Sequence, residues 1–214
     1  MLEIHSLTLG PAVTNCYLIH NSQSGEAAVI DPAWDGHLIV DAAKKRDWRV
    51  ANIWLTHAHF DHFGGAAEVA DAFSPPPPVA LNSADYRLWR ALGGANEFGL
   101  DFDPGPEPTV DLVHGQSLFL GDIEFELRFA PGHSPGSIIF YCPQEKLAFS
   151  GDVIFQNSIG RTDLPLADFD TLMHSINQQI LSLPDETRLL VGHGPETTVS
   201  QEKQSNPFIQ GLGK

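Results

Sequence analysis

Short apolar runs separated by polar turns dominate the N-terminal quarter of the chain. They predict paired strands at Asn15–Ile19 and Ala27–Ile30, and a third, β-rich run predicts a buried strand at Val50–Leu55. Apolar residues recur at helical spacing over about Gly36–Arg46, and Asp35 directly before them is a suitable helix cap. This part of the chain is therefore expected to combine strands with one helix.

The middle of the chain continues with shorter elements. Apolar spacing predicts helices at Ala66–Phe73 and Ser83–Leu92, with a strand at Val79–Leu81 between them. Gly93–Thr109 is rich in glycine and proline, which predicts a long loop. Leu112–Phe129 is then expected to form two or three antiparallel strands.

The last third of the chain contains the most regular helical pattern. Strands are expected at Ser137–Tyr141, Lys146–Phe149 and Leu189–Val191. Before the last of these, apolar residues spaced by four predict a helix over Phe169–Leu183, with Asp168 as its N-cap. The order of strands and helices along the chain favours an α/β sandwich with mixed sheets over a doubly wound parallel sheet.

Length and charge narrow the class of protein. The chain has 214 residues, which suits a single domain over residues 1–214. Its 27 acidic and 12 basic side chains give a net charge of −15. That charge disfavours nucleic acid and anionic membranes as partners, because both are bound through clustered Lys and Arg.

The same sequence suggests a soluble, cytoplasmic protein. We find no cationic leader and no apolar stretch long enough to span a bilayer. Cys16 and Cys142 are too few for a disulfide framework and are expected to be small buried residues. The oligomeric state is left open.

Histidine is the unusual residue, with ten copies against twelve of Lys and Arg together. Three of them fall with one aspartate in the run Thr56-His57-Ala58-His59-Phe60-Asp61-His62, directly after a predicted strand. Imidazole nitrogens and carboxylate oxygens are ligands of borderline-soft divalent ions. His57 and His59, two residues apart, can converge on one ion, whereas Asp61 and His62 can face a second. The alternative is a solvated histidine-rich turn.

Three later strand ends each carry one more ligand-type residue. His133 lies in Ala130-Pro131-Gly132-His133-Ser134, Asp152 in Phe149-Ser150-Gly151-Asp152, and His193 in Val191-Gly192-His193-Gly194. Singly, each is a common cap or turn residue. Together with the first motif they predict a metal site assembled from distant parts of the chain. Five histidines are expected to have no ligand role: His5, His20, His37, His114 and His174.

These segments, in this order, resemble the metallo-β-lactamase superfamily, and within it the short bacterial glyoxalase II proteins (hydroxyacylglutathione hydrolases). The resemblance extends over nearly the whole chain, from T-N-C-Y-L-I through A-V-I-D-P, G-R-T-D-L-P and V-G-H-G-P-E-T-T to N-P-F. It implies a four-layer αββα sandwich with the site at one edge between the sheets. It also implies a single domain that lacks the C-terminal helical glutathione-binding domain of the longer enzymes.

The resemblance further implies two adjacent divalent metal ions, Zn²⁺ first, with iron or manganese as alternatives. One ion would be held by His57, His59 and His133, and the other by Asp61, His62 and His193, with Asp152 bridging them. Asp31 matches a position that supports the metal loop.

The implied reaction is hydrolysis of a small-molecule thioester such as S-lactoylglutathione by a hydroxide held between the ions. Asp61 and Asp152 would be its catalytic carboxylates, with Asp61 orienting the hydroxide or accepting its proton. Asp at position 152 and His at position 62 favour these hydrolases over true β-lactamases, and His59 in place of Glu disfavours the redox di-iron branch.

Substrate recognition is less defined by the sequence. Arg161 matches a glutathione-binding lysine of the longer enzymes and is a candidate for a substrate carboxylate, or else pairs with Asp163 or Asp168. Two other reactions remain open. One is a mononuclear iron persulfide dioxygenase with ligands matching His57, His133 and Asp152, and the other is a lactonase-like hydrolase of another small ester.

Overall fold

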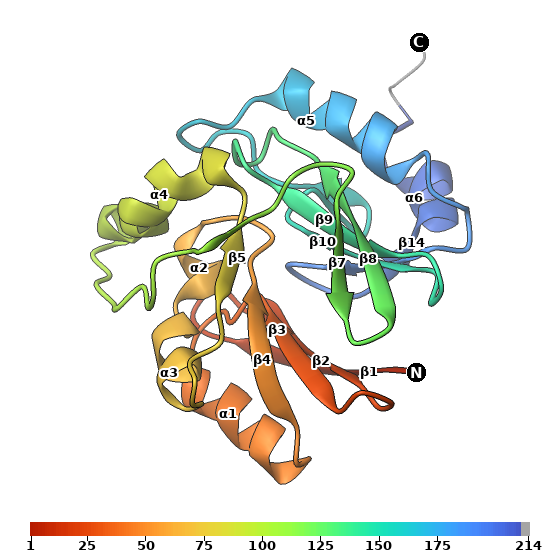
Figure 1. Ribbon diagram of the computed structural model, residues 1–214. Coiled ribbons are helices and arrows are strands. Elements are labelled where there is room, and N and C mark those ends of the chain that lie inside the picture. Colours follow the sequence, from red (N-terminus) through yellow and green to blue (C-terminus); the bar gives the residue numbers. More distant parts are fainter. Residues whose placement is uncertain (211–214) are drawn as a thin grey trace.

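Two six-stranded sheets with helices on their outer faces make up the computed structural model, which describes residues 1–210 (Figure 1). The first sheet contains, in spatial order, β1 (Leu2–Leu9), β2 (Thr14–Asn21), β3 (Glu26–Ile30), β4 (Arg49–Trp54), β5 (Val79–Leu81) and β6 (Val110–Asp111). Strands β1 to β3 are antiparallel, whereas β3 to β6 are parallel, so this sheet is mixed as the sequence predicts.

The second sheet comes from the second half of the chain. Its strands, in spatial order, are β14 (Thr197–Thr198), β13 (Arg188–Val191), β10 (Leu147–Gly151), β9 (Ile138–Cys142), β8 (Ile123–Phe129) and β7 (Ser117–Leu120). Only β10 and β13 pair in parallel. A separate small hairpin joins β11 (Ile154–Phe155) to β12 (Ser158–Ile159).

The sheets are joined by a core of large apolar side chains. Residues alternate across a strand, so Tyr17 and Ile19 of β2 point to this core, while Leu18 points to the opposite face. Phe125 and Phe140 come from the second sheet and pack on Trp54 of the first, with ring centroids 5.2 and 5.6 Å away. The two sheets therefore form the inner layers of the sandwich.

Helices cover the two outer faces (Figure 1). The helices around the first sheet are α1 (Gly36–Lys45), α2 (Phe60–Phe63), α3 (Ala66–Asp71), the 3₁₀-helix η1 (Ser83–Asp85), α4 (Tyr86–Arg90) and the 3₁₀-helix η2 (Leu92–Phe98). Those around the second sheet are α5 (Phe169–Ser175), the π-helix η3 (Ile176–Ile180) and α6 (Val199–Ser205). The predicted four-layer αββα sandwich is confirmed.

Three local predictions need correction. Asp35 stands before α1 but its side chain makes no capping hydrogen bond, because its backbone is left-handed at φ 49°. Gly93–Thr109 is not wholly a loop, since η2 begins at Leu92. The helix predicted over Phe169–Leu183 is α-helical only to Ser175 and continues as a π-helix to Ile180.

Other predictions agree with the structure. Asp168 caps α5 by accepting a hydrogen bond from the Thr171 amide at 2.8 Å. Cys16 and Cys142 are both buried and unpaired. Within residues 1–210, none of the helices has the length and apolarity that crossing a bilayer requires.

Candidate metal centre

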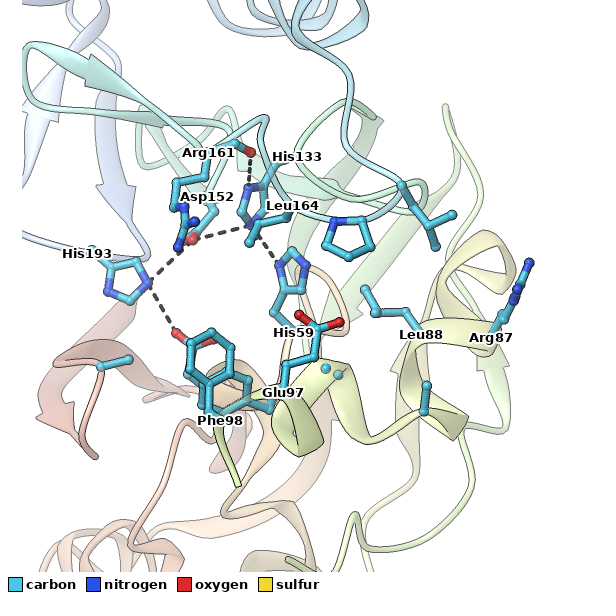
Figure 2. A pocket seen from close by; sticks show the side chains of 18 of the residues that line it. His59, Arg87, Leu88, Glu97, Phe98, His133, Asp152, Arg161, Leu164 and His193 are labelled. Atoms are coloured by element: carbon cyan, nitrogen blue, oxygen red, sulfur yellow. Dashed lines mark hydrogen bonds and ion pairs between the residues drawn. The ribbon is translucent and has the colours of Figure 1, made fainter. Parts of the chain in front are cut away.

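Seven His and Asp side chains from four separate segments meet at one edge of the sandwich. Figure 2 shows His59, His133, Asp152 and His193 among them. They are the residues that the sequence singles out: His57, His59, Asp61, His62, His133, Asp152 and His193. The first four follow β4, and the others follow β8, β10 and β13. The ends of strands from both sheets thus bring together residues up to 136 positions apart in the chain.

Their ligand atoms fall into three overlapping groups, each with all atoms within 4.8 Å of one another. The first is His57, His59 and His133, and the second is Asp61, His62 and His193. Asp152 joins His57 and His62 in the third group. The arrangement therefore has room for two neighbouring cations with Asp152 between them.

Hydrogen bonds fix two imidazoles of the first group with their lone pairs facing each other. Thr56 Oγ1 donates its proton to Asp31, so it accepts from His57 Nδ1 at 3.0 Å. The Arg161 carbonyl likewise accepts from His133 Nδ1 at 2.9 Å. In the neutral form of each ring, Nε2 would then lack a proton, and the two Nε2 atoms lie 3.2 Å apart. A cation is the group that such an arrangement accommodates.

The second group also has buried ligand atoms that a cation would satisfy. His62 Nδ1 donates to Asp31 Oδ2 at 2.9 Å, which directs Nε2 towards Asp152 Oδ1 at 3.3 Å. Neither His62 Nε2 nor Asp152 Oδ1 has a hydrogen-bond partner, although both atoms are buried. The donor set and these two orphaned atoms fit a divalent metal ion.

Asp152 lies between the two groups, and Asp61 lies at the edge of the second. Asp152 Oδ2 is 3.5 Å from His133 Nε2 and 3.4 Å from His193 Nε2, so its carboxylate reaches both sides. Asp61 Oδ2 is 3.2 Å from His193 Nε2 and accepts a hydrogen bond from Thr14 Oγ1 at 2.7 Å.

Burial and neighbouring charges give these groups unusual pKa values in the metal-free chain. Burial and the neighbouring imidazoles hold the pKa of His57 well below its ordinary value, which keeps its ring neutral as metal ligation requires. Burial alone would also lower the pKa of His62, but Asp152, Asp61 and Asp31 raise it well above normal.

The start of β2 clamps the loop that carries His193. Asn15 Nδ2 donates to the carbonyls of Val191 and Gly194, at 3.0 and 2.9 Å, and Tyr17 Oη donates to Val191 at 2.7 Å. A Cβ atom at Gly192 would lie 2.0 Å from Asp152 Oδ1. Only glycine at this position lets the loop approach the carboxylate.

Sequence reasoning missed Asp85. Its carboxylate is fully buried and accepts hydrogen bonds from the amides of Ala58 and Gly136, at 2.9 and 2.6 Å, and from Ser134 Oγ at 2.7 Å. Asp85 therefore ties the loop of His57 and His59 to the loop of His133. No local motif marks it, because its partners come from two distant segments. Asp31, which the resemblance singles out, is 2% exposed and saturated by Thr56 and His62.

A cavity of about 540 Å³ opens beside the cluster, between the segment from α4 to η2 and residues 161–166 (Figure 2). Arg161 lines it, but its guanidinium makes a bidentate contact with Asp163, at 2.8 and 2.9 Å. This is one of the pairings that the sequence leaves open for Arg161.

The five other histidines lie outside the ligand groups found in residues 1–210. His20 contacts Glu3, His37 contacts Glu68, and His5 contacts Arg46. His114 accepts a hydrogen bond from the Phe129 amide, and His174 is exposed.

Comparison with known proteins agrees with the site. Residues 9–193 match the metallo-beta-lactamase superfamily, a range that contains all seven cluster residues. The chain belongs to this superfamily. Membership in this superfamily supports a metal-dependent hydrolase and agrees with a cluster suited to two divalent ions.

Within the superfamily, full-length relatives are similar. A probable metallo-hydrolase of Bacillus subtilis (YqgX) is 37% identical, covering 96% of this chain and 97% of that protein. The hydroxyacylglutathione hydrolase GloC of Haemophilus influenzae is also 37% identical, covering 91% and 92%.

Solved structures of superfamily members share the fold. The BLEG-1 B3 metallo-beta-lactamase has a TM-score of 0.89 and 38% identity, covering 99% of this chain and 100% of that one. TTHA1623, solved in a di-iron-bound form, has a TM-score of 0.87 and 38% identity, covering 95% and 99%.

Proposed function

We propose that the protein hydrolyses small-molecule thioesters such as S-lactoylglutathione, in the manner of glyoxalase II, with two divalent metal ions. The observation that carries the proposal is the position of Asp152 between two complete donor groups. The similarity to GloC of Haemophilus influenzae supports the thioester as substrate.

We propose Zn²⁺ as the first choice for both ions, with iron or manganese as alternatives. Histidine nitrogen and carboxylate oxygen suit all three. His57, His59 and His133 would hold one ion, Asp61, His62 and His193 the other, and Asp152 both. When bound, such ions supply Lewis acidity, which lowers the pKa of water and offsets negative charge on the carbonyl oxygen.

The residues of the chain orient these donors and handle protons. Asp61 Oδ2 lies beside His193 Nε2 at the rim of the cavity, where its carboxylate can orient a water molecule or accept its proton. Asp31 and Thr56 fix the ring orientation of His62 and His57, so the donors need no rearrangement to bind. The leaving group is a thiolate with a pKa of about 8.5, so a dedicated general acid is unnecessary.

We also propose that Arg161 binds the substrate, which would compete with Asp163 for the guanidinium. A substrate carboxylate would have to share the guanidinium with that partner. Arg161→Ala should then raise KM for anionic thioesters more than for neutral ones, and an equal effect on both would remove this role.

The sequence also leads us to propose the partners of the protein and its location in the cell. We propose a small-molecule thioester as the partner, with no nucleic acid and no membrane, in the cytoplasm. The net charge of −15 supports this choice, because polyanionic surfaces would be repelled.

A persulfide dioxygenase needs one iron, on residues matching His57, His133 and Asp152. The second donor group, Asp61, His62 and His193, would then have no use, which favours the dinuclear hydrolase. A lactonase-like activity on another small ester would use the same metals and is tested by the same assay.

The deciding experiment compares four substrates on the metal-loaded protein. We expect thiol release from S-lactoylglutathione, slower turnover of a γ-lactone and of a chromogenic β-lactam, and no oxygen uptake with glutathione persulfide. Oxygen uptake with one iron per chain, without thiol release, would overturn the proposal.

A further inference from the structure

The cavity beside the metal centre has a mainly apolar wall. Its large apolar side chains are Phe60, Leu88, Phe98, Phe155, Leu164 and Leu166. Two of them stand open to solvent, Phe98 at 59% and Leu166 at 53% of their full exposure. Exposed apolar side chains around a cavity of this size are typical of a site that receives an apolar ligand.

Apart from the metal cluster, the cavity is lined by three charged side chains: Arg87, Glu97 and Arg161. Arg161 is neutralised by Asp163. Arg87 and Glu97 are exposed, and neither has an ion pair or side-chain hydrogen bond within residues 1–210. Arg87 is thus the one cation of the cavity wall without a partner in that part of the chain.

The positions of Arg87 and Glu97 in the cavity wall decide how they would act on a charged substrate. Figure 2 places Arg87 on α4, at the side of the cavity away from Asp152 and His193, with Leu88 and Glu97 between Arg87 and the cluster. An anion of the substrate would be repelled by Glu97 and attracted by Arg87. A ligand reaching from the metal centre to Arg87 therefore passes Leu88 and the Glu97 carboxylate before it meets a cation, so its middle part must be uncharged and any carboxylate must lie beyond Glu97.

Resting on the proposed thioesterase activity, we propose that the preferred substrate is a thioester carrying an apolar group that ends in a carboxylate. The thioester carbonyl lies at the metal centre, the apolar group contacts Phe98 and Leu88, and the carboxylate pairs with Arg87. A glutathione thioester is polar along most of its length and uses less of this wall.

Two chromogenic substrates that differ only in one carboxylate test the proposal. The acetyl thioester of 5-thio-2-nitrobenzoate carries an aromatic ring with one carboxylate, and that of 4-nitrothiophenol carries the same ring without it. We expect kcat/KM to be about tenfold higher for the first, the usual effect of a charge-assisted hydrogen bond. Arg87→Gln should raise KM about tenfold for the first substrate and leave KM for the second within twofold.

Arg90→Gln is the matched control, because Arg90 lies on the same helix and pairs with Glu107 at 2.8 Å. It should change neither KM. Phe98→Ala should raise KM for both aromatic thioesters and change KM for S-lactoylglutathione less. Equal KM values for the two aromatic thioesters, with no effect of Arg87→Gln, would overturn the proposal.

Binding without turnover separates this proposal from the thioesterase itself. The methyl thioethers of the same two thiols cannot be hydrolysed, and calorimetry with the metal-loaded protein measures their affinity directly. Tighter binding of the carboxylate form, lost in Arg87→Gln, supports the subsite even if no thioester is cleaved. Equal affinity of the two thioethers rejects the subsite even if thioesters are cleaved.

Discussion

Asp85 Oδ2 accepts a hydrogen bond from the Ala58 amide at 2.9 Å, which anchors the backbone between His57 and His59. The other oxygen of the same carboxylate accepts from the Gly136 amide, beyond His133. One buried side chain thus sets the distance between the two loops that carry the first donor group.

Asp85→Asn should weaken metal binding at His57, His59 and His133 by about 10–100-fold. An amide presents an NH₂ group where one oxygen stood, so it opposes either the Ala58 or the Gly136 amide. Competition with a chromophoric chelator measures the affinity.

Two variants control for a general loss of stability. Asp41→Asn changes an exposed carboxyl on α1 and should leave affinity unchanged. Ser134→Ala removes only one of the bonds to Asp85 and should have a smaller effect in the same direction. Wild-type affinity in a folded Asp85→Asn variant would show that Asp85 does not position the ligands.

Thr56→Val should reduce both stability and metal affinity. The Thr56 hydroxyl links Asp31 to His57 and is buried, so its loss leaves His57 Nδ1 without an acceptor. We expect about 1–3 kcal/mol less stability in the metal-free protein, measured by denaturant unfolding.

Thr187→Val is the matched control for Thr56. The Thr187 hydroxyl is also buried but has no hydrogen-bond partner, so its removal should be neutral or stabilising. An equal loss of stability in both variants would contradict the role assigned to Thr56.

Gly192→Ala should remove bound metal. Its Cβ would lie 2.0 Å from Asp152 Oδ1 and 2.9 Å from His62 Cε1, so Asp152 must move. Elemental analysis should find fewer than two ions per chain. Gly194→Ala changes the same loop where no atom lies within 4 Å, and should keep its metal despite a strained φ of 78°. Two bound ions per chain in Gly192→Ala would contradict the claim that Asp152 holds both metal ions.

Asp152→Ala should lose metal and activity together, because its carboxylate reaches both donor groups. Chelation of the wild-type protein should lower its Tm, since ions that bind only the folded state stabilise it. The Tm of Asp152→Ala should respond much less to chelator. Retained hydrolysis in this variant would exclude bridging by Asp152.

The seven cluster residues could be predicted because each belongs to a short motif that follows a strand and is visible in the sequence. His133 and His193, for example, lie next to glycines after β8 and β13. Asp85 could not be predicted, because its importance arises from contacts between loops that are distant in sequence.

Backbone details were likewise set by tertiary contacts. Gly93 and Gly94 suggested a loop, yet Gly93 packs so closely on Phe60 that a Cβ would lie 2.2 Å from its amide nitrogen. This contact holds η2 against the metal loop. Asp35 has a left-handed backbone and does not cap α1, and the Glu68 carboxylate accepts a hydrogen bond from the His37 amide at 2.6 Å in its place.

The most direct test of the account is a metal titration of the metal-free protein, followed by the rate of thioester hydrolysis. Two donor groups joined by Asp152 predict that the rate reaches its maximum at two ions per chain. A maximum at one ion per chain, or no thioester hydrolysis at any metal content, would contradict it.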